Sequence, residues 1–378
     1  MESGTRCTRW CGLSLAVLLL FLSSLVGLPT ATTAAADRSS AYGSENAIRK
    51  LLKGKHHQAA TADLAGAPGD VAHRELDESL TLALAKAGQQ YVSDSGGYFG
   101  FGEATTGGAG GDVVFVTNFA DSGISTLRYW CGLPGKRIIK FDQDCTITLK
   151  SRVECTNDKT VDGSGYKVRI TGWGLSANRV SNVVFKNLCI AKTKLDGVTI
   201  RLSSRIVVQG CTISGVGDGG TDVITHSSEI SILNNHYTHM WKTILLGNSD
   251  KDTGDTVMSV TVAFNFFDGC ISRLPRARFG RVHVCANSYL NWGTYAIGAS
   301  EKAHLLVENC FFHPAKNKYV NNLHEGLNDG TVIEYRSNTM NDAKLLLTHL
   351  GKVDMPYTCP VKDESTIRSQ AGVPYECI

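Results

Sequence analysis

The chain has 378 residues, of which 42% are apolar and 19% are charged, and its formal net charge is +3. This composition excludes a disordered or low-complexity protein and leaves enough apolar residues for one or two domains with a sizeable core. The small net charge argues against a general nucleic-acid binder, so basic residues are informative only where they are concentrated.

The first segment has the features of an export signal. Arg6 and Arg9 precede an apolar run from Leu13 to Leu28, and small residues follow it through Ala34–Ala36. We predict that residues 1–36 are a signal peptide, that the mature chain is secreted, and that it has no membrane association after cleavage. A membrane anchor is the alternative, but the apolar run is short for a span and no basic stop-transfer cluster follows it.

Residues 37–90 show no pattern of a packed core, and we predict an N-terminal extension that is either flexible or a pro-segment. The character changes at a glycine-rich stretch, Gly96–Gly111, which leads into an apolar run at Val113–Val116. The stretch lacks the Gly-Lys-Ser/Thr ending of a phosphate-binding loop. We therefore interpret it as close backbone packing at the entry to a β-domain.

Strand-like runs recur along the rest of the chain, and their equivalent positions lie 22 to 30 residues apart. With many turn residues and no helical pattern between the runs, this period predicts an all-β fold, a parallel β-solenoid over residues 91–345. Residues 346–378 are expected to form a C-terminal tail packed on it. A β-sandwich is the alternative, but it needs shorter and more even hairpin spacing. The runs are Arg137–Phe141, Val183–Ile190, Ile206–Ile213, Ile230–Tyr237, Val260–Phe267, Val282–Tyr289, Leu305–Phe312 and Val332–Met340.

Alignment of the runs places a leucine, a cysteine and then five asparagines in one column of the predicted stack. Side-chain amides at equivalent bends of stacked coils can hydrogen-bond along the stack as a ladder. The column therefore supports the solenoid. Its members are Leu188, Cys211, Asn235, Asn265, Asn287, Asn309 and Asn338.

Of the 12 cysteines, two lie in the predicted signal peptide and ten remain in the mature chain. A secreted protein can form disulfide bonds, although sequence does not give their connectivity. Cys359 and Cys377 flank the C-terminal tail and could staple it. Four others lie inside strand-like runs and are interpreted as small buried residues. These four are Cys189, Cys211, Cys285 and Cys310.

Acidic residues next to glycines occur on two successive predicted coils, at Asp196 on one coil and at Asp218 and Asp222 on the next. Oxygen ligands on glycine-flanked loops, with no histidine or thiol nearby, suit a hard cation such as Ca²⁺. Asp-Gly pairs are also ordinary turn formers, and this alternative stays open here.

Basic residues follow on the next coils. Lys242 precedes an apolar run, and the stretch Cys270–Tyr289 carries four arginines and His283. Several guanidinium groups at one strand edge suit planar anions such as carboxylates. A solvated loop is the alternative for the arginines, and a solvated strand end is the alternative for the lysine. If the coils stack, these groups and the acids line a groove that matches a polyanion with a carboxylate on every sugar.

An ordered series of motifs extends from Gly100 to Pro314, includes Thr160–Gly165 and Leu245–Asp250, and is densest at Arg273–His283. This series resembles the pectate lyases, particularly those of plants. The resemblance implies an enzyme with a right-handed, single-stranded parallel β-helix. Such an enzyme cleaves de-esterified homogalacturonan (polygalacturonate) by Ca²⁺-assisted β-elimination and releases unsaturated oligogalacturonides. It also implies pectin in the cell wall as the partner, no nucleic acid, and a monomer.

The resemblance also assigns roles to single residues. It implies catalytic roles for Arg273 and Lys242. It implies substrate binding by Arg278, Arg276 and His283, and calcium binding by Asp196, Asp218 and Asp222.

Two departures from the family leave alternatives open. Val198 stands where relatives carry an Asp two positions after the first calcium aspartate, and Gln209–Gly210 stand where they carry Asp-His. These losses weaken the predicted calcium site. One alternative is a catalytically weak cell-wall protein that binds polyuronate. The other is a calcium-independent pectin lyase, against which the retained Asp218, Asp222 and Lys242 argue.

Overall fold

The computed structural model describes residues 97–321, 330–346 and 350–377. The predicted signal peptide (1–36) and N-terminal extension (37–90) lie outside these residues. In the part of the chain that is described, no helix is long and apolar enough to cross a membrane.

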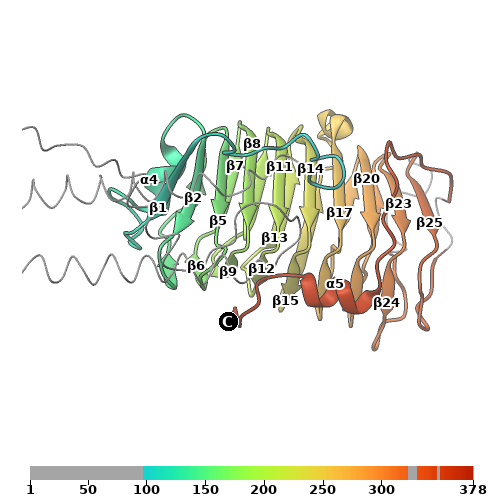
Figure 1. Ribbon diagram of the computed structural model, residues 1–378. Helices are drawn as coiled ribbons and strands as arrows, with labels where there is room; N and C mark the ends of the chain where they lie inside the picture. The colour runs from blue at the N-terminus through green and yellow to red at the C-terminus, as the bar shows by residue number, and fades with distance from the viewer. Residues whose placement is uncertain (1–96, 322–329, 347–349, 378) are drawn as a thin grey trace, which may run out of the picture. The chain divides into compact units, whose positions relative to one another are not determined.

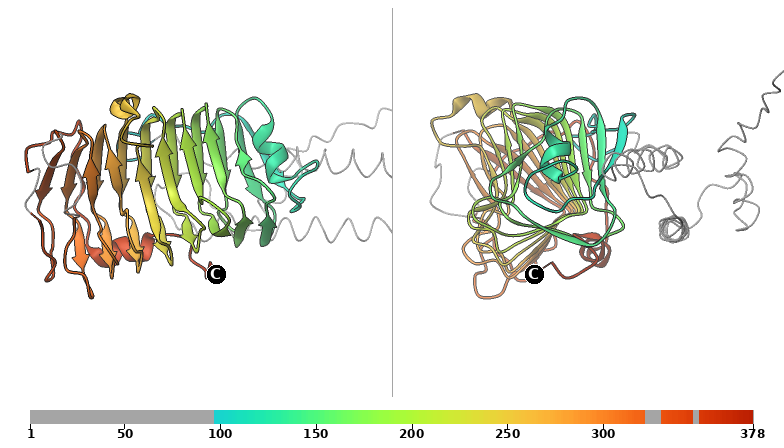
Figure 2. Two further views of the ribbon diagram at one scale, coloured as in Figure 1. Left: turned by 180° about the vertical axis from the view of Figure 1, so that it is seen from behind. Right: turned by 90° about the vertical axis from the view of Figure 1, so that its left-hand side faces the viewer.

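Three parallel sheets run along the stack of coils, and the coils from β2 to β22 pass through sheets A, B and C in turn (Figures 1 and 2). The predicted parallel solenoid is therefore confirmed. Sheet A contains β1 (Asp112–Val116), β2 (Arg137–Phe141), β5 (Lys159–Asp162), β8 (Ser181–Lys186), β11 (Ser204–Gln209), β14 (Ser228–Leu233), β17 (Ser259–Ala263), β20 (Arg281–Cys285), β23 (His304–Glu308) and β25 (Val332–Arg336). Sheet B contains β3 (Cys145–Thr148), β6 (Val168–Gly172), β9 (Cys189–Thr193), β12 (Thr212–Ser214), β15 (His236–Thr238), β18 (Phe266–Asp268), β21 (Ser288–Leu290) and β24 (Phe311–His313). Sheet C contains β4 (Val153–Glu154), β7 (Leu175–Asn178), β10 (Val198–Arg201), β13 (Gly219–Ile224), β16 (Lys242–Leu246), β19 (Arg276–Arg278) and β22 (Gly298–Ser300).

Most of the predicted runs are two strands joined at a bend. Val183–Ile190, for example, covers most of β8 in sheet A and the start of β9 in sheet B. The strands of sheet C were not among the predicted runs. They are short and lack a regular alternation of apolar and polar residues, as in Gly219–Ile224 and Arg276–Arg278. Sheet C is the sheet that carries most of the candidate site.

Side-chain amides form the predicted ladder at the bend between sheets A and B. Oδ1 of Asn265 accepts from the backbone N–H of Asn235, and Oδ1 of Asn287 accepts from the backbone N–H of Asn265, each at 2.9 Å. All three side chains are fully buried. The ladder therefore supplies hydrogen bonds at a bend that water does not reach.

The prediction that Asn309 belongs to this ladder is wrong. In the register of β20 and β23, the residue that follows Asn287 in the column is Cys310. The backbone N–H of Cys310 donates to Oδ1 of Asn338 at 2.9 Å, so the amide ladder resumes one coil later. Asn309 has a φ of +55° and donates its backbone N–H to the carbonyl of Arg336. The sequence alignment of this coil was therefore wrong by one residue relative to the register of the strands.

The core between the sheets is apolar and contains a row of aromatic rings. Successive rings of the row are stacked, with centroids 4.6 to 5.3 Å apart. Such offset aromatic stacks add stability beyond the burial of their area. The rings belong to Tyr237, Phe267, Tyr289 and Phe312.

The glycine-rich stretch crosses the face of sheet A that points away from the core, and we call residues 99–108 the N-terminal strap (Figure 1). The backbone N–H of Phe101 donates to Oγ1 of Thr261 on β17, and that of Gly108 donates to Oγ1 of Thr160 on β5. A Cβ at Gly108 would collide with the carbonyl of Arg137. The predicted close backbone packing is confirmed.

The C-terminal tail, residues 350–377, runs back along the solenoid. Disulfide bonds join Cys359 to Cys285 on β20 and Cys377 to Cys189 on β9. The prediction that Cys189 and Cys285 are simply small buried residues is therefore wrong, whereas Cys211 and Cys310 are free and buried. The two tail cysteines staple the tail to separate coils.

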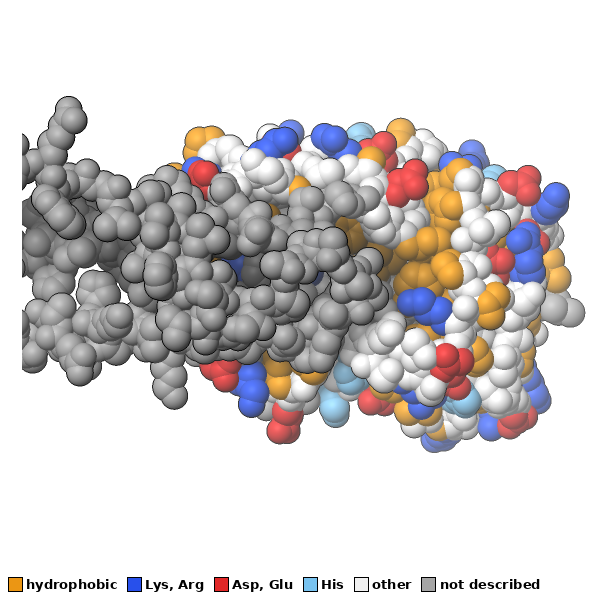
Figure 3. Space-filling model, in the orientation of Figure 1, with side chains coloured by type: hydrophobic (Ala, Val, Ile, Leu, Met, Phe, Trp, Pro, Cys, Tyr) orange, Lys and Arg blue, Asp and Glu red, His pale blue; other side chains and the backbone are white. Residues whose placement is uncertain are grey.

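Few helices accompany the sheets in the described residues. α4 (Leu127–Gly132) lies near the first coil, where the Cys131–Cys155 disulfide joins it to the chain after β4. The 3₁₀ helix η2 (Thr253–Val257) lies in the loop after β16, and α5 (Glu364–Gln370) packs against β21. On the face drawn in Figure 3, charged side chains of both signs are interspersed, in keeping with the small net charge.

Candidate functional site

The three predicted metal ligands lie on two neighbouring coils, at or near the N-terminal ends of strands β10 and β13 of sheet C. Asp196 precedes β10, Asp218 precedes β13, and Asp222 lies within β13 opposite Thr199 of β10. The next coil places Lys242, the first residue of β16, opposite Gly219. Parallel stacking therefore brings together residues that are up to 46 positions apart.

Asp196 is buried and already has partners. Its Oδ2 accepts from Nη2 of Arg152 at 2.6 Å and from Oγ1 of Thr199 at 2.8 Å, and its Oδ1 accepts from the backbone N–H of Gly219 at 3.2 Å. Arg152 was not predicted as a site residue, because it belongs to no motif and precedes a strand of two residues. The guanidinium group thus places one positive charge beside the acidic set, by which we mean Asp196, Asp218 and Asp222.

Asp218 and Lys242 form the second pair. Nζ of Lys242 lies 2.6 Å from Oδ1 of Asp218, and both side chains are partly exposed. Because exposed ion pairs are worth little free energy, this contact can open at small cost when a ligand arrives.

Asp222 has a buried carboxylate oxygen, Oδ1, to which the described residues donate no hydrogen bond. A Cβ on Gly219 would collide with that atom, so a larger residue at position 219 would require the carboxylate to shift. Burial, and after it the nearby carboxylate of Asp196, raises the pKa of Asp222 from 3.8 to about 8, although Arg273 opposes the shift. A buried oxygen with no donor, in a set made only of carboxylates, fits a hard cation such as Ca²⁺.

The raised pKa leads to a prediction about stability in the presence of a chelator. Between pH 4 and 8 the folded protein keeps the proton on Asp222 that the unfolded chain has lost, so the free energy of unfolding falls as the pH rises. Asp222→Asn removes this dependence. We expect the variant to melt higher than the wild type at pH 8, by a Tm difference on the order of 3 °C.

Thermal melts followed by circular dichroism at pH 4.5, 6 and 8 check this expectation. The Tm difference should shrink toward zero at the lowest pH, where both forms of residue 222 are neutral. A difference that is the same at every pH would contradict the burial of a charged carboxylate as its cause. Thr199→Val, which changes a neighbouring side chain that does not titrate, is the matched control.

The interpretation of Val198 as a missing calcium ligand is corrected by the structure. Val198 is fully buried in the apolar core, whereas the next side chain, Thr199, contacts Asp196. A carboxylate at position 198 would point into the core. Gln209 ends β11 in sheet A, and Gly210 lies at the following bend with a φ of +62°, so neither belongs to the acidic set.

The predicted catalytic arginine lies on the coil after Lys242. Ser272 forms a parallel bridge with Lys242, and the carbonyl of Arg273 accepts from the backbone N–H of Ile244 at 2.6 Å. Arg273 has a φ of +62°, and its positive charge acts on Asp222. The backbone thus fixes Arg273 beside the lysine and the acids.

The two arginines of β19 differ in exposure. Nε of Arg278 contacts Oδ1 of Asp250, whose side chain is 63% exposed on the loop after β16. Arg276 is buried, its Nη2 lies 3.3 Å from Oγ of Ser300, and burial together with Arg278 lowers its pKa. Of the two arginines, Arg278 is therefore the one whose partner, the exposed Asp250, could be replaced by the carboxylate of a ligand.

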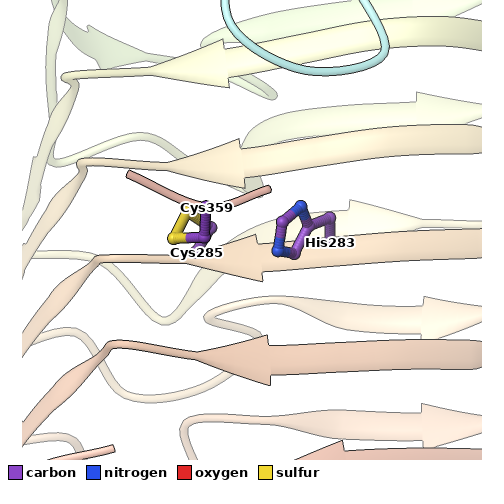
Figure 4. A group of neighbouring side chains, drawn as sticks. All are labelled: His283, Cys285 and Cys359. Atoms are coloured by element: carbon purple, nitrogen blue, oxygen red, sulfur yellow. A yellow bond between two sulfur atoms is a disulfide. The ribbon is translucent and has the colours of Figure 1, made fainter. Parts of the chain in front are cut away.

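The structure does not bring His283 to this group. It lies on β20 in sheet A, fully buried, with Nε2 2.9 Å from Oε1 of Glu308. Figure 4 shows it beside Cys285 and Cys359, and within the described residues these three form a cluster of possible metal ligands. The two sulfur atoms form a disulfide bond, so they are not free thiolates.

Comparison with known proteins agrees with this arrangement. Residues 73–345 match a family model described as pectate lyase. The chain is 37% identical over 226 residues to Probable pectate lyase 4 of Arabidopsis thaliana, and the match covers 56% of this chain and 61% of that protein. It is 34% identical over 303 residues to Pectate lyase 2 of Ambrosia artemisiifolia, with 72% and 76% covered. The first of these relatives is therefore matched over less than two thirds of its length.

A solved structure shares the fold. The crystal structure of Jun a 1, the major allergen from cedar pollen, superposes with a TM-score of 0.68 at 28% sequence identity. The match covers 79% of this chain and 96% of the cedar protein.

Proposed function

The chain belongs to the pectate lyase family, and from this premise we propose that it is a secreted enzyme that cleaves de-esterified homogalacturonan by Ca²⁺-assisted β-elimination. One observation carries the proposal. Three carboxylates, a lysine and an arginine from four adjacent coils meet at sheet C, and Oδ1 of Asp222 has no hydrogen-bond partner among the described residues. The product is an unsaturated oligogalacturonide, and the protein acts as a monomer on pectin in the cell wall.

Substrate binding uses the cations along sheet C. Arg278 takes the carboxylate of a galacturonate unit in a planar, charge-assisted contact, in exchange for the exposed carboxylate of Asp250. Arg276 is covered by its neighbours, and its role is to support Arg278 rather than to touch the sugar. Lys242 exchanges Asp218 for a second substrate carboxylate in the same way.

In the elimination, the C5–H bond of a galacturonate unit breaks and its electron pair forms the C4–C5 double bond. The C4–O bond to the neighbouring sugar then breaks, and that oxygen takes up a proton. Arg273 accepts the C5 proton in its neutral form, after it has released its own proton to solvent, and Lys242 stabilises the negative charge that develops on the adjacent carboxylate. When bound, Ca²⁺ is held by Asp196, Asp218 and Asp222 and adds positive charge that makes the C5 proton more acidic.

A second candidate function, polyuronate binding with weak catalysis, is favoured by a specific observation. Arg152 and Lys242 already neutralise Asp196 and Asp218. A cation must compete with these pairs, so calcium affinity is expected to be lower than that of three unpaired carboxylates. The same groove still offers Arg278 to a uronate chain.

The experiment that tests the proposal is an absorbance assay on the purified mature chain. With polygalacturonate and Ca²⁺, ultraviolet absorbance from the unsaturated product should rise, and a chelator should reduce the rate at least about tenfold. Ca²⁺ should also raise the Tm of the wild type more than that of Asp222→Asn.

The other outcomes separate the alternatives. Calcium-independent activity on highly methylated pectin would identify a pectin lyase. Binding of polygalacturonate without any rise in absorbance, under every condition, would leave the weak polyuronate binder and refute the enzyme.

A further inference from the structure

Trp241 is a large aromatic side chain that the solenoid leaves in solvent. It is 67% exposed, more than any other aromatic residue in the described ranges. Tryptophan is normally highly buried, because its large apolar surface is costly to hydrate. An exposed indole directly before Lys242 is therefore accessible to a ligand that binds at the lysine.

The backbone beneath the indole is held firmly. The carbonyl of Trp241 accepts from both the backbone N–H and Oγ of Ser272, each at 2.9 Å. Lys242 pairs with Gly219 on the coil before and with Ser272 on the coil after. Trp241 thus lies in the turn that enters sheet C, on the coil between those that carry Asp218 and Arg273.

We propose that Trp241 is a stacking platform for a pyranose ring and a determinant of affinity for oligogalacturonate. The inference rests on the proposed function, since it places a sugar at the same groove. A galacturonate unit offers a carboxylate to cations such as Lys242 and Arg278, and its ring also has an apolar C–H face. The cations make no apolar contact with this C–H face, whereas an aromatic ring can pack against it and exclude water.

Charge alone would bind any polyanion of suitable spacing. An aromatic surface beside the cations restricts the groove to polyanions built from rings, because only a ring presents a flat apolar face together with its carboxylate. Trp241 therefore adds specificity that the arginines and the lysine do not supply.

The test compares Trp241→Ala, Trp241→Phe and the wild type, with Val361→Ala as the matched control. Val361 is an apolar side chain that is 84% exposed on the C-terminal tail, away from sheet C. Calorimetry with trigalacturonate should show affinity weakened about fivefold to tenfold in Trp241→Ala. Trp241→Phe, which keeps an aromatic face, and Val361→Ala should stay within about twofold of the wild type. KM for polygalacturonate should rise with the loss of affinity, and kcat should change little.

A fluorescence titration reports the contact directly. Saturation with trigalacturonate should change the tryptophan emission of the wild type, and this change should be absent in Trp241→Phe even though that variant binds. Wild-type affinity in Trp241→Ala, or an unchanged emission spectrum on saturation of the wild type, would overturn the inference.

The outcome is separable from that of the proposed function. If the wild type turns over polygalacturonate and Trp241→Ala does so with the same KM, the stacking role fails and the lyase stands. If the wild type binds trigalacturonate through Trp241 without turnover, the lyase fails and the stacking role stands. If the wild type neither binds nor cleaves, both fail.

Discussion

Arg273→Ala is expected to lower kcat on polygalacturonate by about 10²- to 10⁴-fold, the range typical of a lost general base. The side chain of Arg273 acts on Asp222 through its charge, and its neighbours on the stack are Lys242 and Ile244. Within residues 97–321, 330–346 and 350–377, Arg273 is the arginine whose charge acts on Asp222. The loss should appear in kcat, because the proton is taken only in the transition state.

Folding should survive this substitution. Arg273 contributes to the sheet through its backbone, since its carbonyl accepts from Ile244, and alanine keeps that hydrogen bond. The Tm should therefore stay within a few degrees of the wild type. Arg281→Ala is the control, because Arg281 is exposed on sheet A, with its guanidinium over the ring of Phe101. Near-normal turnover by Arg273→Ala, together with an intact fold, would place the base elsewhere.

Asn265→Ala is expected to cost about 3 kcal/mol or more of unfolding free energy, one of the larger effects of a single substitution. Oδ1 of Asn265 accepts from the backbone and side chain of Asn235, and its Nδ2 donates to the carbonyl of Ile232 and to Asn287. Alanine leaves these buried groups without partners, because no water reaches the bend.

Urea denaturation measures this cost, and the last asparagine of the ladder provides the control. Asn338 is half-buried at the last coil, where it accepts from Cys310 and donates to Val307. Asn338→Ala should cost only about 1 kcal/mol, because solvent can replace part of its hydrogen bonds. Equal losses for the two variants would show that burial of the ladder is not what makes Asn265 important.

The fold could be predicted because the solenoid repeats its chemistry at a fixed interval. From Cys211 onward, the bend between sheets A and B recurs with an amide or a thiol, and this regularity is kept although the loops vary in length. The register between adjacent coils is harder to predict than the fold, because positions that differ by one residue have similar local sequence. Asn309 was assigned to the ladder in place of Cys310 for this reason, although the strand pairing of β20 and β23 decides in favour of the thiol.

The site was predicted less completely, and the reasons are physical. Asp196, Asp218, Asp222, Lys242 and Arg273 come together because equivalent positions of a parallel stack are neighbours. Arg152 reaches Asp196 from outside the repeat pattern, and no motif marks a side chain that acts across 44 residues. Sequence cannot tell that His283 faces Glu308 in sheet A, since strand alternation fixes a side chain's face only after the sheet is known.

The N-terminal strap and the disulfide bonds of the C-terminal tail affect the order in which the coils unfold. A solenoid held only by contacts between adjacent coils can unzip from its ends, one coil after another. Here the strap connects β17 to β5, and the disulfides join the C-terminal tail to β9 and β20, so the coils between β5 and β20 are linked by segments that cross them. We expect these coils to melt as one cooperative unit, with reduction of the disulfides restoring sequential loss of coils.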